Sequence, residues 1–187
     1  MSQSLLLQIA RNSIIEVFEA THIINKNELL QSYPVLKQSY PSFITLYLGD
    51  ELRGSYGSIS AKKTLLEDIM HHAKAAAFED ERFTPLKTSE FLHCSIELSL
   101  LSEPEEISYT DINDLKEKVR IGKDGLILVL GDKEASFLPQ IWSQLKTFDN
   151  FLTHLLNEAG LSLEDMQQHP KIYSFQIEKE RDEPILK

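Results

Sequence analysis

A glycine-bearing stretch, residues 52–61 (Leu-Arg-Gly-Ser-Tyr-Gly-Ser-Ile-Ser-Ala), constrains the fold more than any other part of the chain. The apolar run from Phe43 to Leu48 favours a strand, and the turn residues 49–51 predict a hairpin that returns through the stretch. A helix is then predicted from Thr64 to Phe78, where the first residues have capping-box spacing. Glycine allows a ligand or a second backbone to come close. The stretch is therefore either a closely packed strand or part of a binding site.

Helical and strand patterns alternate irregularly along the rest of the chain. Apolar spacing predicts further helices at 4–19, 111–119, 162–168 and, in two pieces, after Pro139, with one short helical turn at 28–31. Alternation predicts strands at 93–101, 126–130, 135–138 and 173–177. The charged tail after Glu178 is expected to fray. Hairpin-joined strands without a regular βαβ repeat predict an α+β fold with antiparallel sheets.

Length and charge limit the classes of function. The chain has 187 residues, which fits one domain or one domain built from two lobes. Its net charge of -10 disfavours binding to nucleic acid or to an anionic membrane. No segment approaches the roughly 20 apolar residues of a membrane helix.

Cys94 is the single cysteine, so an intramolecular disulfide is excluded, and a reducing cytoplasm is expected. Cys94 is expected to pack inward.

Several short motifs occur in order between residues 43 and 161. They are Leu52–Gly57, Ala76–Phe83, Leu101–Pro104, Ile121–Leu126, Leu138–Gln140, Phe151–Leu152 and Glu158–Leu161. In order and spacing they resemble the AMMECR-one domain family, also called protein A of the AmmeMemoRadiSam system. The resemblance implies a single AMMECR-type domain over 1–187 with two lobes, each an antiparallel sheet with flanking helices, and a cleft between them. The larger lobe would contain both termini and the smaller one a middle section.

The first motif departs from the family pattern, which usually reads Leu-Arg-Gly-Cys-Ile-Gly. Here Ser55 takes the cysteine position and Tyr56 the isoleucine position. A thiolate is a far better nucleophile than an unactivated hydroxyl, so a chemical role of the cysteine would be impaired in this chain. Alternatively, the position needs only a small side chain. The resemblance assigns no reaction, but it implies a pathway shared with a radical-SAM enzyme and a MEMO-like protein.

The candidate site consists of motif residues beside glycines or a helix end. They are Arg53, Gly54, Ser55, Gly57, Asp80, Arg82 and Phe83. One interpretation is a carboxylate–guanidinium cluster that faces the cleft and binds a partner or a small anionic ligand. The other is a structural ion pair, either Arg53 with Asp80 or Asp80 with Arg82. We expect an accessory protein, and the alternative is an enzyme of unknown reaction that acts on a small anionic molecule.

Other chemistries have weak support in the sequence. No Gly-x-Ser-x-Gly elbow surrounds Ser55. His71 and His72 follow Glu67 and Asp68 at helical spacing, which matches no metal motif and is typical of exposed helix pairs. Neither a dinucleotide fingerprint nor a P-loop is present, so no cofactor is predicted. Aromatic residues at helical spacing from Trp142 to Phe151 predict core packing.

Overall fold

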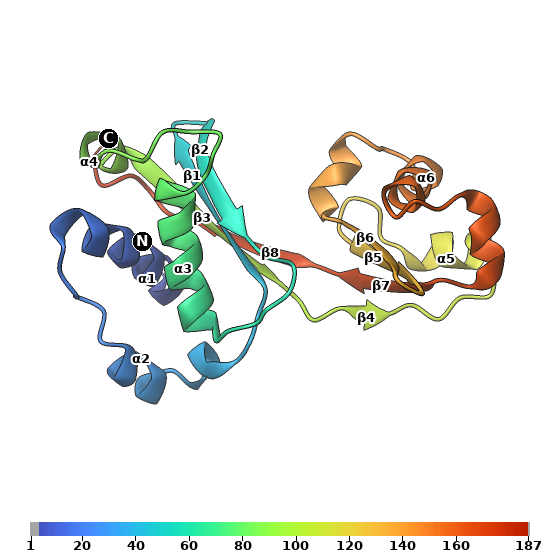
Figure 1. Cartoon of the computed structure of the whole chain (residues 1–187), viewed down its shortest axis with the longest axis horizontal. Coiled ribbons are helices and arrows are strands. Elements are labelled where there is room, and N and C mark those ends of the chain that lie inside the picture. The colour runs from blue at the N-terminus through green and yellow to red at the C-terminus, as the bar shows by residue number, and fades with distance from the viewer. Residues whose placement is uncertain (1–3, 187) are drawn as a thin grey trace. The chain divides into compact units, whose positions relative to one another are not determined.

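The computed structural model describes residues 4–186, which form two compact units. The first unit contains the described residues up to Leu101 together with those from Glu178 onward, and the second contains Ser102–Ile177. Each unit has one four-stranded sheet with helices, and the hairpins pair in antiparallel fashion. The predicted α+β fold with antiparallel sheets is confirmed (Figure 1).

The first unit carries most of the helices. Its elements are α1 (Leu5–Glu19), α2 (Lys26–Ser32), the 3-10 helix η1 (Pro34–Lys37), β1 (Ser42–Leu48), β2 (Glu51–Gly57), α3 (Leu65–Phe78), α4 (Thr88–Phe91), β3 (Cys94–Leu101) and β8 (Ile177–Arg181). The strand order is β2-β1-β3-β8, so β2 is an edge strand. The Ser4 hydroxyl caps α1, and Thr64 with Glu67 forms the predicted capping box of α3.

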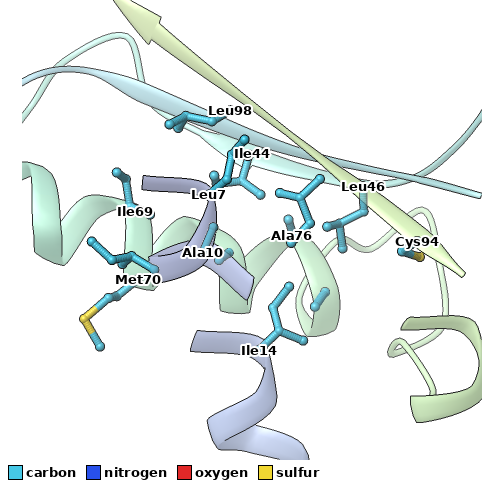
Figure 2. Packing of buried hydrophobic residues seen from close by; sticks show 14 of the residues in the cluster. Leu7, Ala10, Ile14, Ile44, Leu46, Ile69, Met70, Ala76, Cys94 and Leu98 are labelled. Carbon is cyan, nitrogen blue, oxygen red and sulfur yellow. The ribbon is translucent and has the colours of Figure 1, made fainter. Parts of the chain in front are cut away.

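Apolar faces of α1, α3 and the sheet form the core of the first unit. Both helices run beside the sheet, and Figure 2 shows Ile14 of α1, Ala76 of α3 and Leu98 of β3 turned toward the same interior. Cys94 contributes to this core and has no exposed surface, as predicted. The short alanine side chains of α3 allow the helix to pack closely against β2, which positions the glycine-bearing stretch.

The second unit contains the remaining elements. They are β4 (Glu105–Glu106), α5 (Ile112–Lys118), β5 (Gly125–Leu130), β6 (Lys133–Phe137), η2 (Pro139–Ser143), α6 (Phe148–Glu158), η3 (Leu163–Gln168) and β7 (Lys171–Phe175). The strand order is β4-β7-β5-β6. Trp142 stacks on Phe151 with ring centroids 3.8 Å apart, which confirms the predicted aromatic core. Buried Asp124 accepts hydrogen bonds from Arg120 and Gln176 and fixes the turn before β5.

The prediction for the C-terminal tail was wrong. The tail after Glu178 is ordered rather than frayed, because it forms β8, which ends at Arg181. The Asp182 carboxylate accepts hydrogen bonds from the Arg11 side chain at 2.9 Å and from the Ile96 amide at 2.6 Å. These contacts join residues far apart in sequence, so no local sequence pattern predicts them. The helical turn predicted at 28–31 is confirmed, and it belongs to the longer helix α2.

Among residues 4–186, no helix is both long and apolar enough to cross a membrane.

Candidate functional site

Arg53 lies at a bulge in the edge strand β2. The pairing with β1 shifts between Leu46, which faces Gly54, and Tyr47, which faces Leu52, so Arg53 is the extra residue. The residue is 8% exposed, and its guanidinium donates to both Glu90 carboxylate oxygens at 3.0 Å and to the Thr84 carbonyl at 3.0 Å. Arg53 therefore ties β2 to α4. The partner is Glu90, so the suggested pairing of Arg53 with Asp80 was wrong.

Asp80 holds the chain where it leaves α3. Its carboxylate accepts two hydrogen bonds from the Arg82 guanidinium, at 2.9 and 2.7 Å, which confirms the suggested pair. It also accepts the Ser55 backbone amide at 2.8 Å. An edge strand leaves such amides without a strand partner. Asp80 thus accepts a hydrogen bond from a backbone amide at the open edge of β2 and also pairs with Arg82.

The two glycines of the motif are required by close packing. A Cβ atom on Gly54 would overlap the backbone carbonyl oxygen of Ala76 in α3. A Cβ atom on Gly57 would overlap the Phe43 ring and the Ser42 carbonyl oxygen. Both positions therefore bring β2 against its neighbours without leaving space for a ligand at the glycine itself.

Phe83 completes the arrangement. Its ring centroid lies 5.7 Å from the guanidinium carbon of Arg53 and 5.6 Å from that of Arg82. These distances are within the range of cation–π contacts. The structure thus brings all the predicted site residues to one region of the first unit, with Glu90 added. We call this set the motif cluster: Arg53, Gly54, Ser55, Gly57, Asp80, Arg82, Phe83 and Glu90.

Comparison with known proteins decides the family. A family model described as AMMECR1 matches residues 7–180. The chain belongs to the AMMECR1 family.

Relatives of this AMMECR1 chain occur in archaea. It is 35% identical over 194 residues to a protein of Sulfolobus acidocaldarius, covering 97% of this chain and 84% of the relative. It is 38% identical over 143 residues to protein SSO0193 of Saccharolobus solfataricus, covering 73% of this chain but only 61% of that relative. The crystal structure of the uncharacterized protein PH0010 from Pyrococcus horikoshii matches with a TM-score of 0.74 and 26% identity, covering 97% of this chain and 92% of the other.

The charges of the motif cluster in this AMMECR1 protein stabilise one another. The Arg82 guanidinium holds the pKa of the Asp80 carboxyl well below its usual range, with help from the Ser55 amide. Arg53 lowers the pKa of Glu90 in the same way, and Asp80 raises the pKa of Arg82. Both carboxylates are therefore ionised at neutral pH, and each guanidinium already has a bidentate anionic partner.

Ser55 lacks the surroundings of an activated nucleophile. Within residues 4–186, its hydroxyl is hydrogen-bonded only to the Thr45 hydroxyl, at 3.3 Å. A serine nucleophile needs a base within hydrogen-bonding reach. Cys94 carries the thiol of this chain. It lies in β3 in the core, where burial raises its pKa to about 11. Cys94 does not replace the family's usual cysteine in the motif cluster.

A buried polar contact between His72 and Ser42, near the motif cluster, was not predicted from the sequence. His72 is 4% exposed, and its Nδ1 lies 3.0 Å from the hydroxyl of fully buried Ser42. Burial lowers the pKa of His72, while nearby Asp68 opposes that shift. The expectation of exposed histidine pairs was therefore wrong for His72, although His71 is exposed. Across residues 4–186, no group of three or more His, Cys, Asp or Glu side chains is arranged to hold a metal ion.

Glu90 was also missed as a site residue. Its carboxylate accepts the Lys87 backbone amide at 2.9 Å at the start of α4. Nothing in the sequence could show that the same carboxylate also pairs with Arg53, since the two residues meet only in the folded unit.

Proposed function

We propose that this AMMECR1 protein is a cytoplasmic, non-catalytic or at most co-catalytic accessory protein of a pathway that contains a radical-SAM enzyme and a MEMO-like protein. In this proposal the motif cluster binds one of these partners, with Arg53, Ser55, Asp80 and Arg82 forming and supporting the contact surface. The reaction itself takes place on the partner.

One observation carries the proposal. Both guanidiniums are held by carboxylates of the same cluster, yet the Arg82 side chain is 58% exposed. A fixed, solvent-facing arginine beside the half-buried Phe83 ring suits protein recognition, because arginine and aromatic side chains are enriched at interfaces. A preorganised side chain also loses less conformational entropy when a partner binds.

The rival function is an enzyme that acts on a small anionic molecule at the same residues. Such a site would need a guanidinium free to receive the anion, together with a general base or nucleophile. The carboxylates of Asp80 and Glu90 compete for the two guanidiniums, and the Ser55 hydroxyl has no base beside it. These contacts favour recognition over chemistry, so the rival ranks second.

The test measures binding to purified partners from the same cells. Biolayer interferometry would compare the wild type, Arg82→Ala and the exposed control Lys116→Ala against the radical-SAM enzyme and the MEMO-like protein. We expect binding of at least one partner, weakened about tenfold or more by Arg82→Ala and unchanged by the control. Absence of binding to both, or equal binding by Arg82→Ala, would contradict the proposal. Loss of turnover with unchanged partner binding would favour the rival enzyme.

A further inference from the structure

A second feature of the first unit lies outside the motif cluster. Two adjoining cavities, of about 430 and 270 Å³, share Lys26, Met70 and Lys74 in their walls. The larger cavity also touches His22, which precedes α2. The smaller one touches Lys63, just before α3, and His71, within α3. We call this surface the lysine groove and define it by His22, Lys26, Lys63, His71 and Lys74. Its size is that of a small-molecule site.

The cations of the lysine groove are largely unpaired. Within residues 4–186, the ammonium groups of Lys26 and Lys63 make no hydrogen bond or ion pair, and both are exposed. Both ammonium groups help to lower the pKa of Glu67, although hydrogen bonds from Thr64 are the main cause. This is a local excess of positive charge on a chain with a net charge of -10.

The two carboxylates in the walls are already engaged. Glu16 accepts the backbone amides of Ile23 and Ile24 at 3.0 Å and binds Lys74 at 3.2 Å. Glu67 accepts the Thr64 hydroxyl at 2.9 Å in the capping box of α3. These carboxylates build the walls and neutralise Lys74 in part. Lys26 and Lys63 remain available for a ligand.

We propose that the lysine groove binds a small molecule that bears phosphate groups. Lysine binds phosphate as a compact point charge, whereas recognition of planar carboxylates favours arginine. Among residues 4–186, no arginine lines the two cavities. The exposed imidazoles of His22 and His71 add hydrogen-bonding groups beside the ammonium groups. The inference is independent of the proposed function, because none of these residues belongs to the motif cluster.

The test uses sodium pyrophosphate as the probe and isothermal titration calorimetry at low ionic strength. The Lys26→Ala/Lys63→Ala variant is compared with Lys123→Ala/Lys146→Ala, which removes the same charge from exposed lysines of the second unit. We expect the groove variant to bind about tenfold more weakly or worse and the control to bind as the wild type does. Absence of binding to the wild type, or equal losses in both variants, would overturn the proposal.

Two further measurements make the outcome specific. Citrate, a polyanion without phosphorus, should bind the wild type more weakly than pyrophosphate, and equal affinity would overturn the assignment to phosphate. In NMR spectra of the wild type, pyrophosphate should shift the ring signals of His22 and His71 but leave those of His154, which lies in α6 of the second unit. Unchanged signals from His22 and His71 would overturn the site even if binding were observed.

Discussion

The motif cluster and the lysine groove both lie in the first unit, but their charges are used in opposite ways. In the motif cluster, Arg53 and Arg82 each have a bidentate carboxylate partner. In the lysine groove, Lys26 and Lys63 have no such partner among the described residues. A charged residue in a recognisable motif can therefore serve the fold, while lysines outside any motif keep ammonium groups without a partner among the described residues.

The largest effect is expected from a substitution at a glycine of the motif cluster. Gly54→Ala places a methyl group on the carbonyl oxygen of Ala76, so either β2 or α3 must move. We expect the free energy of unfolding to fall by about 3 kcal/mol, measured by urea denaturation. Ser55→Ala is the matched control and should change it by less than about 1 kcal/mol, because it loses only the 3.3 Å contact with Thr45. Similar losses in both variants would contradict the packing role of Gly54.

The second-largest effect on stability is expected at Asp80, and it should exceed the effect at its ion-pair partner Arg82. Asp80→Ala removes the acceptor of both the Ser55 amide and the Arg82 guanidinium, and should cost about 2 kcal/mol of unfolding free energy. Arg82→Ala leaves Asp80 bonded to the Ser55 amide, so its cost should be under about 1 kcal/mol. Thermal and urea denaturation of both variants would measure the difference. An equal cost for the two variants would show that the edge of β2 does not depend on Asp80.

The Asp80 carboxylate should make the stability of the protein decrease at acidic pH. The folded-state pKa of Asp80 is depressed below its unfolded value, so its contribution is present above the unfolded pKa of about 4 and declines as pH falls below it. The stability difference between the wild type and Asp80→Asn should therefore shrink as pH is lowered from about 6 to about 3. Asp132→Asn, at an exposed aspartate, is the control. If the stability difference between the wild type and Asp80→Asn stayed constant with pH, the depressed pKa of Asp80 would be contradicted.

The smallest effect on stability is expected in the lysine groove. Lys26→Ala/Lys63→Ala removes two exposed ammonium groups without hydrogen-bonding partners, so the free energy of unfolding should change by no more than about 0.5 kcal/mol. Urea denaturation without added anion checks this expectation. A loss as large as that of Asp80→Ala would show that these lysines support the fold, and the contrast with the motif cluster would fail.

Much of the fold followed from local patterns. The capping box of Thr64 and Glu67, the hairpin before the glycine-bearing stretch and the buried strand face around Cys94 were all predicted correctly. Each of these features depends on residues close together in sequence. The tail was mispredicted because Asp182, the residue after β8, is held by contacts with Arg11 and Ile96, which lie far away along the chain.

The site was predictable only in outline. The motifs indicated which residues gather around β2, and the Asp80–Arg82 pair has a short separation that made it a reasonable expectation. The pairing of Arg53 with Glu90 depends on the bulge in β2 and on the path of the chain after α3, neither of which has a local signature. The lysine groove was missed for the same reason: Lys26 and Lys63 are far apart in sequence and line one pocket only in the folded unit.

The most direct test of the contrast is the thermal shift produced by pyrophosphate in three proteins: the wild type, Lys63→Ala and Arg82→Ala. A ligand that binds only the folded state raises the unfolding temperature. We predict that pyrophosphate raises it for the wild type and for Arg82→Ala, and by much less for Lys63→Ala. A shift that is lost in Arg82→Ala but kept in Lys63→Ala would mean that the motif cluster binds anions and the lysine groove does not, which would contradict the account.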